Sequence, residues 1–194
     1  MEFITPIFKW IHIIAGVLWI GLLYFFNWIN GHVAATMDGD TKKKVVPELM
    51  PRALYFFRWG AAWTWVTGMV LLLLVYWMQM NDSMFRELGI GEEASKFKHV
   101  AYLIPFIMVF VYDAFYKSSL AKNTRVATIT SFMGIAGVLC LLICVSQMTS
   151  YRAYNIHLGT MFGSMMAFNV WYRIWPAQQR IITAIKNGDA PNPA

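Results

Sequence analysis

The apolar residues of this chain gather in five long runs, separated by shorter polar segments. The runs cover about residues 7–29, 56–78, 98–116, 126–147 and 155–175. A helix rises about 1.5 Å per residue, so roughly 20 residues cross a hydrocarbon core of about 30 Å. The pattern therefore predicts an all-α integral membrane protein with five transmembrane helices. We expect one bundle over residues 1–180 and a flexible cytoplasmic tail over 181–194.

Composition supports the membrane assignment. Hydrophobic residues make up 58% of the chain and charged residues only 13%, which excludes an ordinary soluble domain. A net charge of +6 would suggest a nucleic-acid partner in a soluble protein, but in a membrane protein Lys and Arg flank the spans. We therefore expect no nucleic-acid partner.

The basic residues predict the orientation of the bundle. With five spans, one side of the membrane carries Lys9, Arg86, Lys96, Lys98 and Arg152. The other side carries the remaining eleven of the 16 Lys and Arg residues, which are Lys42, Lys43, Lys44, Arg52, Arg58, Lys117, Lys122, Arg125, Arg173, Arg180 and Lys186. Because cytoplasmic segments are enriched in Lys and Arg, the N-terminus is expected outside, in the periplasm, and the C-terminus in the cytoplasm.

The segment between the first two spans, residues 31–55, is predicted to be a cytoplasmic loop. It contains the turn signal Asp38-Gly39-Asp40, two prolines, Pro47 and Pro51, and three consecutive lysines at 42–44. Lysines beside a membrane favour contact with anionic lipid headgroups. We expect this loop to contact anionic lipid or a partner subunit.

Histidines are the most informative candidates for chemistry. Between Lys9 and Asn27 the chain has no Asp, Glu, Lys or Arg, and His12 is the single histidine. An imidazole in hydrocarbon is costly unless it is paired or bound to a ligand. His99 follows Lys98 directly, and His157 lies five residues after Arg152. The predicted topology places all three histidines in the outer leaflet, whereas His32 lies past the opposite end of the first span.

Three interpretations compete for this layer of histidines. Two of them could be axial ligands of haem b, as in other membrane bundles. Three imidazoles could instead hold copper or zinc. Each could also form only local hydrogen bonds near an interface. Haem is favoured over a bare metal because the layer has no Asp or Glu and small residues, Gly16 among them, leave room for a flat ligand.

Two cations stand just outside this layer. Lys9 and Arg152 lie where the propionates of a haem would emerge and need cationic partners, although both could equally anchor the helices at the interface. At the opposite end of the third span, Asp113 and Lys117 are four residues apart and are predicted to form an ion pair.

The sequence resembles the urate oxidase N-terminal domain, the membrane part of the bacterial cytochrome-c-linked urate oxidase. The resemblance rests on Trp10–Gly21, on Phe57-Arg58-Trp59 with Trp63-Thr64-Trp65 and Gly68, on Tyr112-Asp113 with Lys117-Ser118, and on His157-Leu158-Gly159, Asn169 and Pro176-Ala177-Gln178. The histidine pattern of the first span is similar, more weakly, to membrane protoporphyrinogen oxidases and copper-resistance membrane proteins.

The resemblance implies a redox-associated module of a bacterial cytoplasmic membrane, in which His12 and His157 match family histidines and His99 does not. The sequence has no C-x-x-C-H haem attachment motif and no segment like a cytochrome c domain, so urate oxidation is not carried over. We expect a haem b electron-transfer subunit of a respiratory or photosynthetic complex, with a periplasmic cytochrome c as a candidate partner. The alternatives are a non-redox structural subunit and a porphyrin- or copper-handling protein.

The orientation can be tested with reporters fused after Pro193. A reporter that is active only in the cytoplasm should be active there, because the basic residues favour a cytoplasmic C-terminus. A reporter that is active only in the periplasm should be silent at the same position. The opposite pair of signals would contradict either the span count or the orientation.

Overall fold

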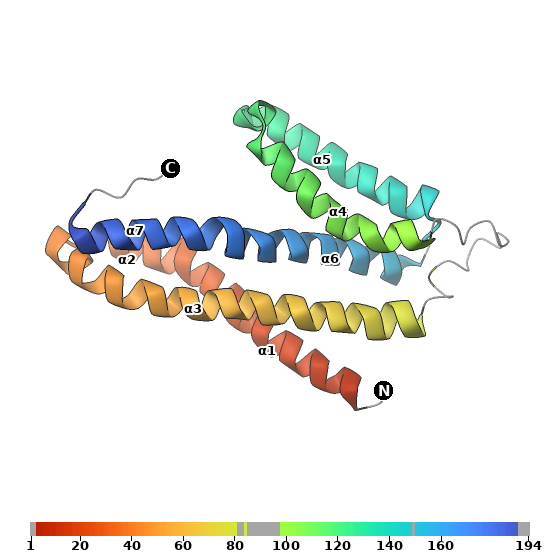
Figure 1. Ribbon diagram of the computed structural model, residues 1–194, viewed down its shortest axis with the longest axis horizontal. Coiled ribbons are helices and arrows are strands. Elements are labelled where there is room, and N and C mark those ends of the chain that lie inside the picture. Colours follow the sequence, from red (N-terminus) through yellow and green to blue (C-terminus); the bar gives the residue numbers. More distant parts are fainter. Residues whose placement is uncertain (1–2, 81–83, 85–97, 149, 190–194) are drawn as a thin grey trace. The chain divides into compact units, whose positions relative to one another are not determined.

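A computed structural model describes residues 3–80, 84, 98–148 and 150–189 (Figure 1). Every regular element in these ranges is helical, which confirms the all-α prediction. The α-helices are α1 (Ile4–Tyr24), α2 (Gly31–Thr36), α3 (Gly39–Leu71), α4 (Lys98–Lys117), α5 (Thr124–Cys140), α6 (Tyr151–Asn169) and α7 (Trp175–Asn187). Four π-helical segments continue them, η1 (Phe25–Asn30), η2 (Leu72–Gln79), η5 (Leu141–Val145) and η6 (Val170–Ile174), and η4 (Ser119–Lys122) is a 3₁₀ turn.

Four of the resulting helical stretches in the described residues are long and apolar enough to cross a membrane. They cover Ile4–Thr36, Gly39–Gln79, Val100–Lys117 and Thr124–Val145. The expected fifth span, residues 155–175, is also helical and coincides with most of α6 and with η6. Its polar residues, among them Asn155 and Asn169, lower its apolar character.

The helices form two compact units, and each is described here by itself. Unit 1 contains residues 1–68 and 167–194, and unit 2 contains residues 69–166. The buried core of unit 1 joins α1, α3 and the segment around η6, through Trp19, Met50, Leu54, Phe57, Ala61, Ala167 and Val170. The core of unit 2 consists of Met84, Ala101, Ile104, Val138, Leu142, Met148, Ala153 and Met161.

The predicted loop over residues 31–55 is wrong. These residues form α2 and the first half of α3, and both Pro47 and Pro51 lie inside α3. Helix α3 repeats apolar residues at helical spacing, and Met50, Leu54 and Phe57 are buried in the core of unit 1. Burial of this apolar face outweighs the backbone hydrogen bonds that the two prolines remove.

Asp38, expected in a turn, instead caps the start of α3. Its carboxylate accepts hydrogen bonds from the Thr41 amide at 2.9 Å and from the Thr41 hydroxyl at 2.7 Å. The bond from the Thr41 amide is that of an N-cap residue, which satisfies an amide that has no partner within the helix. The amide bond, and after it the hydroxyl bond, hold the pKa of the exposed Asp38 carboxyl below its ordinary value.

The C-terminal helix extends further than the sequence predicts. A flexible tail is expected from Ile181, but α7 continues to Asn187. Ile182 packs against the core of unit 1, which gives these turns a buried contact. The helix then ends at Gly188, whose φ of 84° is the left-handed conformation that glycine adopts without strain.

Helices α1 and α3 approach each other closely at Gly60. A Cβ atom on Gly60 would lie 3.3 Å from the backbone nitrogen of Trp19 and 3.4 Å from its Cα. Both residues are buried. The absence of a side chain at position 60 therefore sets how closely the two helices pack.

Replacing Gly60 by leucine should destabilise unit 1 by about 1–3 kcal/mol, because the new side chain meets the backbone of α1. The matched control is Gly21→Leu on α1, where an added Cβ meets nothing within 4 Å. Thermal unfolding of the purified variants in detergent, followed by circular dichroism, measures the difference. Equal unfolding midpoints for both variants would contradict the close approach at Gly60.

Candidate functional site

His12 is held against the backbone of α3 by its ring nitrogen Nδ1. This atom lies 2.9 Å from the carbonyl oxygen of Thr64 and 3.1 Å from the hydroxyl of Thr67. A carbonyl oxygen only accepts hydrogen bonds, so Nδ1 carries the proton and donates it to Thr64. The other ring nitrogen of the neutral imidazole, Nε2, then presents a lone pair.

Gly68 makes room for the His12 ring. A Cβ atom at position 68 would lie 3.0 Å from Cε1 of His12 and 3.5 Å from its Nδ1. Any side chain there would push the ring away from α3. Thr67 also supports the site, because its buried hydroxyl donates to the Trp63 carbonyl at 2.6 Å and thereby directs a lone pair toward the imidazole.

Nε2 of His12 has no hydrogen-bond partner in the part of the chain that the structure describes. A histidine that donates Nδ1–H to a backbone carbonyl and leaves Nε2 free has the tautomer and the support typical of a metal-bound imidazole. Of the predicted ligands, His12 is therefore the one whose surroundings fit that role directly.

His157 on α6 is bound at both ring nitrogens. Its Nδ1 donates to the carbonyl of Ala153 at 2.8 Å, and its Nε2 accepts from the indole Nε1–H of Trp77 at 3.1 Å. The imidazole is fully buried. It stacks on the rings of Trp77 and Tyr102, at centroid distances of 6.4 and 6.0 Å. His157 could bind a metal through Nε2 only if Trp77 moved away.

The remaining predicted site residues are less enclosed. An added Cβ on Gly16 would lie 3.8 Å from Cγ2 of Thr64, an ordinary contact with α3. Lys9 and Arg152 are both exposed. The side chain of His99, at the start of α4, lies outside the described residues.

Two expectations about charged and metal-binding groups can be compared with the structure. The predicted pair of Lys117 and Asp113 is confirmed, with a distance of 2.7 Å between Nζ and Oδ2. Among the described residues, no three His, Cys, Asp or Glu side chains gather closely enough to hold a metal ion. The predicted copper or zinc site therefore has no support in those residues.

Arg58 forms a contact that the sequence did not predict. Its guanidinium carbon lies 3.9 Å from the ring centroid of Trp175 and 5.0 Å from that of Trp171. Such cation–π contacts contribute about 0.5–2 kcal/mol each and join α3 to the segment that follows α6. The spacing of four residues between the two tryptophans places them on one helix face, and this spacing is visible in the sequence.

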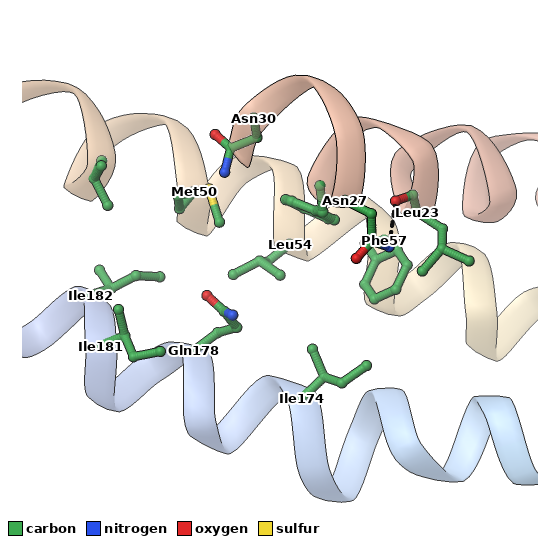
Figure 2. A pocket seen from close by; sticks show the side chains of 12 residues that line it. Leu23, Asn27, Asn30, Met50, Leu54, Phe57, Ile174, Gln178, Ile181 and Ile182 are labelled. Atoms are coloured by element: carbon green, nitrogen blue, oxygen red, sulfur yellow. Dashed lines mark hydrogen bonds between the residues drawn. The ribbon is translucent and has the colours of Figure 1, made fainter. Parts of the chain in front are cut away.

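Unit 1 also contains a cavity of about 440 Å³ (Figure 2). Its lining residues come from α1 with η1, from α3, and from η6 with α7: Leu23, Phe26, Asn27, Asn30, Val46, Met50, Leu54, Phe57, Ile174, Gln178, Ile181 and Ile182. The cavity does not follow from the sequence pattern, because that pattern predicts a loop over residues 31–55 and a flexible tail over 181–194. The signal that was present is the pair of carboxamides, Asn27 and Asn30, at the end of the first apolar run.

Comparison with known proteins identifies the family. The family model described as urate oxidase N-terminal matches residues 38–194. This range includes most of the segments on which the sequence resemblance rests, but not Trp10–Gly21. No curated protein and no solved structure matches the chain. Because the matched range covers most of its length, the chain belongs to the urate oxidase N-terminal family.

Proposed function

We propose that this protein is an electron-transfer subunit of a larger respiratory or photosynthetic complex and that His12 is an axial ligand of haem b. The observation that carries the proposal is the hydrogen bond from His12 Nδ1–H to the Thr64 carbonyl, which leaves Nε2 free. We further propose five spans in a bacterial cytoplasmic membrane, with a periplasmic N-terminus and a cytoplasmic C-terminus.

The residues around His12 fit a haem ligand for physical reasons. A hydrogen bond from Nδ1–H to a carbonyl fixes the ring orientation and raises the basicity of Nε2. The contact with Gly68 limits rotation of the ring. Lys9, three residues before His12, is exposed and is available to pair with a propionate. When bound, the haem would supply one-electron chemistry at its iron.

His157 supports a second candidate function. The satisfied hydrogen bonds of both its ring nitrogens favour a structural residue that fixes the core of unit 2. If the histidines of this chain have only such a structural role, the chain is a non-redox subunit of the complex. The assignment of His157 as a haem ligand, with Arg152 beside it as a propionate partner, stays a prediction.

The proposal is tested by spectroscopy of the purified chain. The wild type should show a reduced-minus-oxidised haem b band, confirmed as a pyridine haemochrome. His12→Ala should lose this band, because the variant lacks the axial nitrogen. The matched control is His32→Ala, since His32 is exposed and its hydrogen bond within the described residues is to the nearby Trp28 carbonyl. A haem-free wild type would favour the structural subunit, and a haem band unchanged by His12→Ala would overturn the assignment of His12 as the ligand.

Trp77→Phe tests the environment of His157. The variant removes the N–H donor and leaves Nε2 of a buried imidazole without a partner, so it should lower the free energy of unfolding by about 1–3 kcal/mol. Trp63→Phe is the control, because Trp63 is exposed. Chemical unfolding followed by circular dichroism compares the two variants. If Trp77→Phe is as stable as Trp63→Phe, the Trp77–His157 bond contributes little.

The same preparations decide the role of His157. Loss of the haem band in His157→Ala, with the fold retained, would support ligation of iron by His157. If the haem band is unchanged in His157→Ala, His157 has a structural role, and His12 stays the proposed ligand of the two histidines.

A further inference from the structure

The cavity of unit 1 combines apolar walls with three uncharged polar side chains. Nine of its lining residues are apolar, and the other three are Asn27, Asn30 and Gln178. No charged side chain is among them. A volume of about 440 Å³ lies within the range of cavities that hold small organic ligands, about 300–1,000 Å³.

The carboxamides reach the cavity from two elements. The π-helical segment η1 carries Asn27 and Asn30, and α7 carries Gln178. Figure 2 shows the Gln178 side chain extending from α7 into the space between the helices, near Leu54 and below Asn30. Single π-helical turns within α-helices occur frequently at functional sites, where they redirect side chains.

Much of the hydrogen-bonding capacity of these groups is unused. The Asn27 amide donates to the Leu23 carbonyl at 2.9 Å, which leaves its side-chain oxygen and one N–H free. The half-buried carboxamides of Asn30 and Gln178 form no hydrogen bond with any residue that the structure describes. A ligand that supplies acceptors and donors would give these partly buried amides hydrogen-bond partners inside the cavity.

The absence of charged residues from the cavity lining indicates that the ligand is uncharged. A carboxylate or phosphate would enter without a cationic partner among the lining residues, and burial of an unpaired charge is costly. A carboxamide both donates and accepts, so it can bind a carbonyl oxygen and a hydroxyl group equally well. The apolar walls favour a ligand whose body is largely hydrocarbon, and a ring with an aliphatic tail meets this requirement. The cavity is lined by α1 with η1, by α3 and by η6 with α7. Two of these helical stretches, Ile4–Thr36 and Gly39–Gln79, contain an apolar window long enough to cross a membrane, so we expect a membrane-soluble ligand.

We propose that this cavity binds a quinone or quinol, an uncharged ring with carbonyl or hydroxyl oxygens and an isoprenoid tail. The carboxamides of Asn30 and Gln178 bind the ring oxygens, and Leu54 and Phe57 contact the ring and the start of the tail. The proposal concerns binding alone and does not depend on whether the chain holds haem.

The test measures binding of a ubiquinone with one isoprenoid unit to the full chain in lipid nanodiscs, by titration calorimetry. Gln178→Leu keeps the approximate size of the side chain and removes its hydrogen-bonding groups, so binding should weaken about tenfold. Asn30→Leu should have a similar effect. Gln179→Leu is the matched control, because Gln179 is exposed and does not line the cavity. Circular dichroism verifies that each variant is folded.

Photolabelling with an azido-quinone then locates the site. Labelled peptides should come from the segments around Asn30, Leu54 and Gln178, and excess ubiquinone should prevent the labelling. Excess dioleoylglycerol, an uncharged lipid with carbonyl and hydroxyl oxygens, should not. Labelling elsewhere, equal affinity in Gln178→Leu and Gln179→Leu, or displacement by dioleoylglycerol would each overturn the proposal. Because these measurements do not read the haem spectrum, their failure is distinct from failure of the proposed haem function.

Discussion

The contact between α1 and α3 is the constraint on which the candidate haem site depends. Gly60 lets the backbone of α1 approach at Trp19. Two turns further along α3, Gly68 faces His12, and Thr64 lies between the two glycines. Residues three or four apart share one helix face. A single stripe of small residues on α3 therefore both packs the helices and brings the Thr64 carbonyl within reach of the imidazole.

The sequence predicts much of this arrangement but not its details. Local patterns predict the helical structure, the apolar spans and the Asp113–Lys117 pair, and they also single out His12 as a candidate ligand. The partner of His157 could not be predicted, because Trp77 is 80 residues away in the chain. Prolines and lysines favour a loop over residues 31–55, whereas the Asp38 cap and the burial of Met50, Leu54 and Phe57 stabilise the first half of α3 as a helix. Local propensity was outweighed there by tertiary packing.

The two histidines share one hydrogen bond of the same kind but differ at the second ring nitrogen. Each donates Nδ1–H to a backbone carbonyl, to Thr64 in one case and Ala153 in the other. The difference lies at Nε2, which in His12 has no partner among the residues that the structure describes and in His157 accepts from an indole N–H. A backbone carbonyl fixes the tautomer, and the group that faces the second nitrogen decides whether that nitrogen is available to bind a ligand.

The π-helical segment η1 affects more than the cavity beside it. A π turn contains about one residue more than an α turn, and one residue corresponds to a rotation of about 100° around a helix. Everything after η1 is therefore rotated relative to the face of α1 that carries His12. Deletion of one residue from η1 would leave His12 in place on α1. It would rotate the residues that follow η1, so that different side chains would face α7. The number of residues between positions 24 and 31 would then distinguish two groups of relatives. One group would share His12 alone, and the other would share both His12 and the cavity lined by carboxamides.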